Sequence, residues 1–439
     1  MKRIFCQFFM IICMFAAFAL HVSAIDSETI VRVGLYYGSS ALDSAKLDND
    51  DADGGKGYRV GYYDEDRDFR KVAEFDNELI TIEPAGSGLR ILDTESGKEL
   101  YETDEDTLAV LPKSDLTWFK QNVYRGGFEY RNDGGAITVI NYVELEDYVK
   151  GVLPYEMTPS WNIEALKAQA VCTRSYAWGS LGKHEAAYGF DLCNTTNCQV
   201  YKGETQATEN SNNAVDETAG EILYYEDEPV IGFFFSSDGG ATEDAKNVWG
   251  YDYPYLKGVE DPYEDTETAY VGYWSKTLTA DEIGEKLRAA GKDIGEVCDV
   301  AITRLTEMGN VNELTITDTD GKSVVLTNSN CRTTLGLNSI RYTVIGSDGT
   351  SGTIQSGKPA GPVGVVSRLL GGRIALASPA AGSVGSSTVT ATGSSFTFDG
   401  AGWGHHVGMS QHGAKCMADE GFDYEEILTF YFTDVEVRE

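Results

Sequence analysis

The sequence predicts an α+β protein with mixed helices and largely antiparallel sheets. Over residues 31–140, short segments of alternating apolar and polar residues are separated by turn residues, which is typical of antiparallel β-structure. Apolar residues then recur with the 3.6-residue period of helices over residues 145–177. The strand pattern returns after Gly220. This order of strands, helices and strands is typical of the α+β class.

The first residues have the features of an export signal. Lys2 and Arg3 precede an apolar stretch at residues 4–20, and Val22-Ser-Ala24 supplies the small residues that a signal peptidase prefers. Because the stretch is about as long as the shortest membrane span, residues 1–24 are either a cleaved signal peptide or an uncleaved anchor. Both alternatives place the rest of the chain outside the cell, at the membrane only if the signal is uncleaved.

Residues 25–123 are expected to form an acidic, β-rich N-terminal region. Residues 89–92 and 99–101 alternate on either side of a predicted turn at residues 93–98, as in a hairpin. The main domain is expected to begin at residue 124, and its first part continues to residue 345.

Two helices are predicted next. The first starts at Asn141, which has Glu144 three residues later as in a capping box, and Pro154 is expected to end it. The second begins near Thr158 or Asn162 and presents an apolar face up to residue 177. Glu156 is therefore expected in the loop between them.

The later elements follow from local patterns in the remaining sequence. Residues 221–225 and 229–235 are predicted strands, the second buried on both faces, and residues 279–290 a helix. Residues 318–322 are the predicted turn of a hairpin. Residues 346–395, rich in Gly and Ser, are expected to be an inserted flexible segment before the C-terminal motif at residues 396–439.

The charge of the chain excludes one class of partner. Lys and Arg total 35 while Asp and Glu total 69, a formal net charge of −34 over 439 residues. Such a protein repels phosphate backbones, so nucleic acid binding is not expected. A hydrophobic content of 42% is enough for a globular core, which argues against a disordered acidic chain.

One pair of cysteines is close in sequence. The four-residue gap between Cys193 and Cys198 suits either a disulfide or half of a zinc site, to which His184 could add a third ligand. Both alternatives stay open. Cys172 lies inside the second predicted helix, where a buried, unreactive thiol is expected.

Glu156 is the first candidate for chemistry. It lies among apolar neighbours, and loss of solvent there would raise the pKa of a Glu and keep its proton near neutrality, as a general acid requires. The alternatives are an exposed loop residue or a helix cap.

Two glycine-containing segments are further candidates. Residues 402–413 hold three histidines, of which His406 and His412 could share a metal, and their glycines suit a cleft that admits a sugar chain. Residues 235–240 follow the predicted buried strand, but Ser237 lacks the GxSxG elbow of serine hydrolases.

Taken in order, several segments resemble the stage II sporulation protein D family: NYVELEDYVKGVLPYEM (141–157), EALKAQAV (164–171), QVY (199–201), SDGG (237–240), GWGH (402–405) and SQHGA (410–414). The resemblance covers residues 124–432 apart from the insertion. It implies an exported protein of the cell wall whose lobes surround a groove for peptidoglycan glycan strands.

The resemblance also implies an activity. Members of the sporulation branch are lytic transglycosylases that cut peptide-stripped glycan between N-acetylmuramic acid and N-acetylglucosamine and leave 1,6-anhydro ends. Glu156 matches the catalytic glutamate and would act as general acid and then as base. No cofactor is required. The matching groove residues are Arg174, Gln199, Tyr201, Ser237, Trp403, His405 and Gln411.

Two departures and two alternatives remain. Some relatives bind zinc at the positions of Cys193 and Cys198 with a histidine where this chain has Asn197, and His406 replaces a usual glycine. The amidase-enhancer branch implies a non-catalytic protein that binds glycan and stimulates a cell-wall amidase. A secreted structural protein is the third interpretation.

Overall fold

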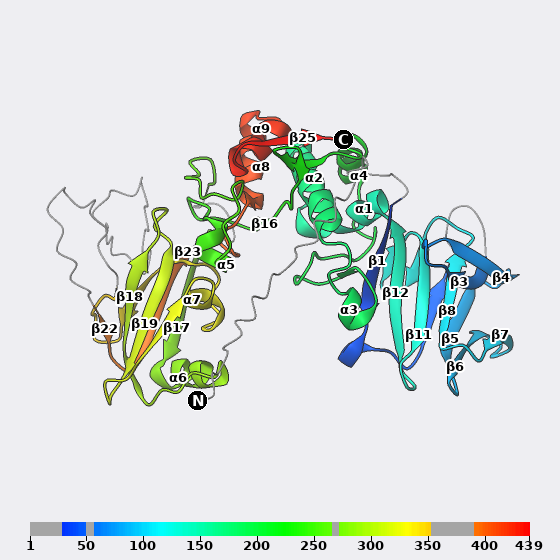
Figure 1. Cartoon of the computed structure of the whole chain (residues 1–439), viewed down its shortest axis with the longest axis horizontal. Helices are drawn as coiled ribbons and strands as arrows, with labels where there is room; N and C mark the ends of the chain where they lie inside the picture. The colour runs from blue at the N-terminus through cyan, green and yellow to red at the C-terminus, as the bar shows by residue number, and fades with distance from the viewer. Residues whose placement is uncertain (1–28, 50–56, 266–271, 353–389) are drawn as a thin grey trace, which may run out of the picture.

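The computed structural model describes residues 29–49, 57–265, 272–352 and 390–439. Helices and mostly antiparallel sheets are mixed along these residues, which confirms the predicted α+β class (Figure 1). The predicted signal at residues 1–24 and most of the predicted insertion lie outside the described residues. No helix in the described part is both long and apolar enough to cross a membrane.

The N-terminal part consists of two sheets that share one core. Their strands are β1 (Ile30–Tyr36), β2 (Ala45–Asp48), β3 (Tyr58–Tyr63), β4 (Phe69–Phe75), β5 (Leu79–Ala85), β6 (Gly88–Asp93), β7 (Glu99–Thr103), β8 (Thr107–Pro112), β9 (Thr117–Phe119), β10 (Asn122–Tyr124), β11 (Gly127–Asn132), β12 (Ile137–Glu144) and the short β13 (Leu192–Cys193). The orders are β13-β1-β12-β11-β8-β3-β4 and β10-β9-β2-β5-β6-β7. The predicted β6–β7 hairpin is confirmed. The first sheet continues past residue 124, because β11 and β12 lie within it.

Helix α1 (Leu145–Glu156) follows β12 directly, and the predicted start at Asn141 is wrong. Asn141 lies in the strand, where its buried amide donates to the carbonyls of Arg125 (3.0 Å) and Gly127 (2.9 Å). A strand flanked by β1 and β11 satisfies its backbone in the sheet, so the local capping signal is overridden.

Helix α1 also does not end at Pro154, as predicted, but includes it and continues to Glu156. The Met157 N–H still donates to the carbonyl of Leu153 at 3.0 Å, so the last turn closes normally. The carbonyl of Gly151 accepts a hydrogen bond from the Lys202 N–H (3.2 Å), which satisfies a group near the proline from outside the helix. Glu156 therefore lies on the last helical turn and not in a loop.

Helix α2 (Ile163–Gly179) is the central element of the structure. Asn162 caps it by accepting the Glu164 N–H at 3.1 Å, as the sequence predicts. Around it pack α1, α4 (Glu209–Asp216), β14 (Ile222–Tyr225), α8 (Gln411–Glu420) and α9 (Tyr424–Tyr431). Helix α3 (Glu185–Tyr188) is a single short turn before β13, and β25 (Val435–Arg438) pairs with β14.

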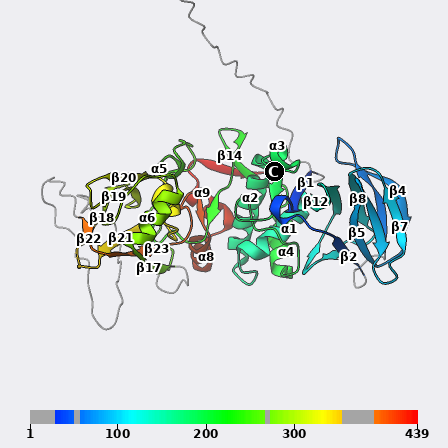
Figure 2. The same ribbon diagram turned by 90° about the horizontal axis from the view of Figure 1, so that it is seen from below.

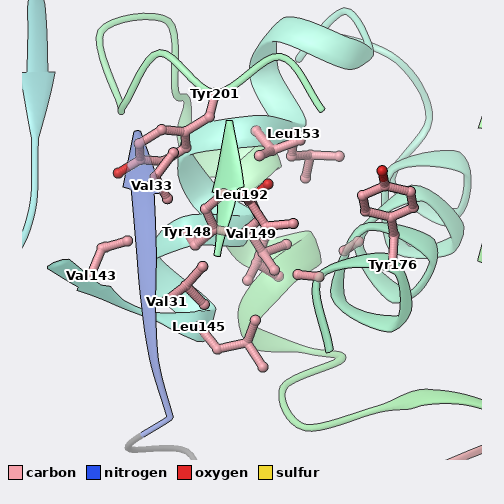
Figure 3. Packing of buried hydrophobic residues seen from close by; sticks show 14 of the residues in the cluster. Val31, Val33, Val143, Leu145, Tyr148, Val149, Leu153, Tyr176, Leu192 and Tyr201 are labelled. Atoms are coloured by element: carbon pink, nitrogen blue, oxygen red, sulfur yellow. The ribbon is translucent and has the colours of Figure 1, made fainter. Parts of the chain in front are cut away.

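The core between α1 and the first sheet is aromatic and aliphatic. Figure 3 shows Tyr148 and Val149 of α1 packed with Val31 of β1 and Leu192 of β13. Tyr201 stacks on Tyr148 with ring centroids 5.0 Å apart. This packing fixes α1, and with it Glu156, relative to the sheet.

The predicted buried strand at residues 229–235 is wrong. Only β15 (Glu228–Pro229) and β16 (Phe234–Phe235) are strands, and the chain between them passes along α2. A Cβ atom on Gly232 would lie 2.8 Å from the Cα atom of Cys172, so the segment packs against a helix instead of a neighbouring strand. Cys172 is fully buried, as predicted.

A second lobe with its own core is inserted between β16 and β24 (Met409–Ser410). After α5 (Ala245–Trp249) it contains β17 (Tyr273–Thr279), α6 (Ala280–Ala289), β18 (Val297–Leu305), β19 (Val311–Asp318), β20 (Ser323–Thr327), α7 (Asn330–Thr333), β21 (Arg341–Gly346), β22 (Ala391–Thr392) and β23 (Ser395–Ala401). The predicted helix at 279–290 and the β19–β20 hairpin are confirmed. In Figures 1 and 2 this lobe and the N-terminal sheets lie at opposite ends, with α2, α8 and α9 between them.

Arg174 of α2 joins several elements of the centre. Its side chain is fully buried and pairs with Glu146 of α1 through Nε and Nη2, both at 2.7 Å. Its Nη1 donates to the carbonyl of Glu221, which precedes β14, at 2.9 Å. Removal of the guanidinium would leave a carboxylate and a carbonyl without their partner.

We expect Arg174→Met to lower the free energy of unfolding by about 3 kcal/mol, because it breaks a buried ion pair and leaves its partners unsatisfied. Urea unfolding followed by circular dichroism measures the change. The matched control is Lys415→Met, which removes the exposed pair with Asp419 and should cost less than about 1 kcal/mol. Equal losses in the two variants would contradict this role of Arg174.

Candidate functional site

Glu156 lies at the C-terminal end of α1 in a partly buried position. Its Oε1 accepts the backbone N–H of Val200 at 2.7 Å, and the side-chain amide of Gln411 is its second partner. Burial raises the pKa of Glu156 above its ordinary value of 4.5, although both hydrogen bonds favour the ionised form and oppose part of the rise. The carboxyl group is therefore placed to keep a proton at higher pH than an exposed glutamate.

The segment at residues 199–201 positions the Val200 N–H. Gln199 is buried and its Nε2 donates to the Tyr148 hydroxyl (3.2 Å) and the Thr173 carbonyl (3.4 Å). Tyr201 is buried too, and its hydroxyl donates to Asn141 Oδ1 at 2.6 Å. Anchored on both sides, Val200 presents its N–H to Glu156.

Three residues expected to line a groove are instead enclosed by protein. Arg174, Gln199 and Tyr201 are each no more than 1% exposed, and protein groups occupy the polar atoms described above. The prediction placed these three residues on the surface of a groove, but in this fold they lie in the core. Their contacts with Glu146 and Tyr148 hold α1 and the Val200 segment in place.

The SDGG and GWGH segments meet through backbone pairing. β16 pairs in parallel with β24, and Ser237 forms an antiparallel bridge with Trp403. Ser237 is fully buried and its hydroxyl donates to Glu264, so it does not line a surface either. Trp403, in contrast, is 45% exposed, and its indole offers a flat apolar face.

His405 and Gln411 complete the predicted set. His405 lies between the rings of Phe235 and Trp249, with centroid distances of 5.4 and 5.2 Å. Burial lowers its pKa to about 3, with the charge of Arg332 as a further cause, so the ring is neutral at physiological pH. Gln411 is the first residue of α8 and also donates to Gln169 of α2 at 3.3 Å.

His406 and His412 have different surroundings. His412 Nδ1 lies 2.8 Å from the Ser236 carbonyl, whereas the buried His406 ring stacks on Phe235 with centroids 5.2 Å apart. His406 has a φ of 65°, a left-handed conformation that explains why glycine is usual there.

His184, Cys193 and Cys198 do converge. One ligand atom of each lies within 4.8 Å of the others, and His184 Nε2 is 3.3 Å from the Cys198 Sγ. The hydrogen bond from Cys198, with that of Thr195, lowers the pKa of Cys193 to about 4. An imidazole and two thiols, one readily ionised, are donors that suit zinc.

Sequence reasoning missed three groups of this region. The Val200 N–H is a backbone group that carries no sequence signal. Asp261 and Glu264, which approach Asp238 in the described structure, are inconspicuous among 69 acidic residues. Only the fold reveals them.

Comparisons with known proteins point to one family. The family model described as Stage II sporulation protein (SpoIID) matches residues 133–225, which include α1 and α2. An uncharacterized protein of Brachyspira hyodysenteriae is 31% identical over 317 residues, 72% of each chain. The Amidase enhancer of Bacillus subtilis is 30% identical over 65% of this chain, which spans only 39% of that protein.

The Stage II sporulation protein D of Bacillus subtilis is 27% identical over 316 residues, 68% of this chain and 76% of that protein. The similarity therefore extends well beyond the segment that the family model matches. On this evidence, the chain belongs to the stage II sporulation protein D family.

Proposed function

We propose that this cell-wall protein is an exported peptidoglycan lytic transglycosylase and that Glu156 is its acid and base. The observation that supports this most directly is a partly buried carboxyl group with a raised pKa, held by the Val200 N–H and Gln411. A glycosidase that hydrolyses its substrate needs two carboxyl groups on opposite sides of the bond, whereas this reaction needs one.

The proposed reaction has two proton transfers at one carboxyl group. Glu156 gives its proton to the glycosidic oxygen between N-acetylmuramic acid and N-acetylglucosamine as that bond breaks. The resulting carboxylate then accepts the proton of the muramyl C6 hydroxyl, whose oxygen attacks C1 of the same sugar. The product is a 1,6-anhydro end, and the enzyme returns to its starting protonation state.

The substrate proposed is glycan from which the stem peptides have been removed. Trp403 supplies an exposed aromatic face on which a sugar ring could stack. The net charge of −34 disfavours a polyanionic substrate, whereas the glycan backbone without peptides carries few charges. The proposed place of action is the cell wall, outside the membrane.

A second candidate is supported by one comparison. The similarity to a protein named Amidase enhancer favours a non-catalytic role, in which this chain would bind glycan and stimulate a wall amidase. In the transglycosylase Glu156 is needed to cleave the glycosidic bond, whereas in an amidase enhancer it would only contribute to the structure of the protein.

We expect Glu156→Gln to abolish formation of 1,6-anhydro ends from amidase-stripped strands, with a rate loss of about 10²- to 10⁴-fold, because the amide cannot donate the proton. Mass spectrometry of the products measures this. The matched control is Glu144→Gln at the exposed N-terminal end of α1, where the side chain makes no capping bond; this variant should keep its activity.

The same assay separates the alternatives. Reducing ends in place of anhydro ends would contradict the transglycosylase reaction. No cleavage by the folded wild-type protein, together with faster release of peptides by an added amidase, would favour the enhancer role.

We expect Gln411→Met to move the alkaline limb of the pH profile of kcat/KM to higher pH. The Gln411 amide stabilises the ionised carboxylate, so its loss raises the pKa of Glu156 and keeps the acid protonated further into the alkaline range. Initial rates on stripped strands give the profile. Lys415→Met, further along α8 on its partly exposed side, is the control and should leave the limb in place. A limb that moves to lower pH in Gln411→Met would contradict this interaction.

We further propose that His184, Cys193 and Cys198 hold a zinc ion as three of its ligands. The ion would join His184, which precedes α3, and Cys198, in the loop after β13, to Cys193 in the edge strand β13 of the first sheet. A disulfide would use two donors and leave the imidazole aside, so the convergence favours the metal.

We expect one zinc per chain by elemental analysis, and loss of that zinc in Cys198→Ser. Cys298→Ser, which changes another partly buried thiol on β18, is the control and should retain the metal. A zinc-free protein in which thiol titration finds two thiols fewer than the denatured, reduced chain would contradict zinc and identify a disulfide.

A further inference from the structure

Three carboxylates converge inside the protein where the SDGG segment meets α8. They belong to Asp238, Asp261 and Glu264, and one oxygen of each lies within 4.8 Å of the others. The three residues are 0%, 5% and 8% exposed. A buried carboxylate is costly unless it is paired, protonated or bound to a metal, and here there are three together.

No ion pair neutralises them. In the part of the chain that the structure describes, no Lys, Arg or His nitrogen lies within 4.0 Å of their oxygens. Their donors are neutral: Glu264 Oε2 accepts the Asp238 N–H (2.9 Å) and the Ser410 hydroxyl (2.7 Å), and Asp261 Oδ2 accepts the Tyr431 hydroxyl (2.6 Å). These hydrogen bonds bring no positive charge, and burial beside Glu264 and Asp261 raises the pKa of Asp238 well above its ordinary value, so the group holds a proton when no cation is bound.

A separate observation points to a ligand. Asp238 Oδ1 accepts the Gly240 N–H at 2.6 Å, but Oδ2, although fully buried, has no hydrogen-bond partner among the described residues. Buried polar atoms without a partner are rare in native proteins, and a bound cation satisfies a carboxylate oxygen as well as a hydrogen-bond donor does. Glu264 and Asp261 are the charged neighbours of Asp238, and the Asp238 carboxyl group lies within hydrogen-bonding reach of Asp261.

The charged residues around the three carboxylates indicate which kind of ion could bind there. Arg341 is buried close to these carboxylates, but its Nη1 donates to the Met308 carbonyl (2.9 Å) and Asn310 Oδ1 (3.2 Å) instead. Glu243 and Glu260 also lie near Arg341, so its single positive charge does not neutralise the three carboxylates. A divalent cation that displaces the proton of Asp238 would supply the missing positive charge.

We propose that Asp238, Asp261 and Glu264 bind a calcium ion. All the donors are oxygens, which hard cations prefer, and the hydroxyls of Ser237 and Ser410 at Glu264 supply further oxygens close by. Calcium accepts irregular protein-only coordination, whereas magnesium requires near-octahedral geometry and keeps several waters, for which an enclosed site is poorly suited.

The site would couple to the candidate active site through one helix. The Ser410 hydroxyl caps α8 by accepting the Gly413 N–H (3.2 Å) while it donates to Glu264, and the next residue is Gln411, the partner of Glu156. A cation that holds Glu264 therefore holds the start of α8. The proposal does not depend on Glu156 being catalytic, because binding is measured directly.

The test uses the full chain after treatment with EGTA and removal of the chelator. Titration calorimetry with CaCl2 should show one saturable site, and MgCl2 should bind at least tenfold more weakly. Saturating calcium should raise the Tm by about 5 °C, because the ion binds only the folded state. Asp238→Asn and Glu264→Gln keep the side-chain shapes and should each weaken calcium binding at least tenfold.

The matched control is Glu102→Gln, which removes one carboxylate of the exposed Glu99–Glu102 pair and should leave calcium binding unchanged. Circular dichroism shows whether each variant is folded; if neither acidic-site variant folds, the calcium-dependent Tm of the wild-type chain decides. Absence of saturable binding with no Tm shift, or binding that the folded Asp238→Asn variant retains, would overturn the proposal. Magnesium binding as tight as calcium binding would overturn the assignment of calcium.

Discussion

The structure depends on the satisfaction of polar side chains on a helix that is buried on nearly all sides. Helix α2 has Gln169, Thr173, Arg174 and Ser175 inside the core, and each would destabilise the fold without a partner. Gln169 meets Gln411 of α8, Arg174 meets Glu146 of α1, and Ser175 accepts the N–H of Leu223 in β14 at 2.9 Å. The Thr173 hydroxyl accepts from Gln169 within the helix, and the Thr173 carbonyl accepts from Gln199. The helix therefore sets the positions of its neighbours through hydrogen bonds as well as through packing.

This arrangement explains how Glu156 acquires its environment. Its two hydrogen-bond partners come from segments that α2 anchors, one through Gln199 and the other through Gln169. Burial raises its pKa, and its place at the C-terminal end of α1, where the helix dipole is negative, acts in the same direction. The end of α1 therefore raises the pKa of Glu156, and the hydrogen bonds from the two facing segments lower it.

Much of the fold could be predicted from local patterns, because periodicity and capping are local. Asn162, Thr279 and the Asp318 turn act within a few residues of themselves, and the structure has them as predicted. Asn141 and residues 229–235 depart from their local patterns because their surroundings come from distant segments, a flanking pair of strands and the surface of α2.

The candidate site could also be predicted only in part. Motif similarity identified the QVY and SQHGA segments, whose Val200 and Gln411 contact Glu156. It could not distinguish side chains that face solvent from those that are buried. Arg174, Gln199, Tyr201 and Ser237 are buried, and only Trp403 among the predicted groove residues has a large exposed surface. Their orientation depends on partners far away in the sequence, such as Glu146 for Arg174, Asn141 for Tyr201 and Glu264 for Ser237, which no local pattern describes.

The insertion of the second lobe between β16 and β24 has a consequence for folding kinetics. These two short strands pair side by side although the whole lobe separates them in sequence. Closing so long a loop is entropically costly, and contacts of high sequence separation form slowly. A lobe with its own core can shorten that search by folding first and bringing its two ends together. On a growing chain, the contact between Gln411 and Glu156 must then be among the last to form.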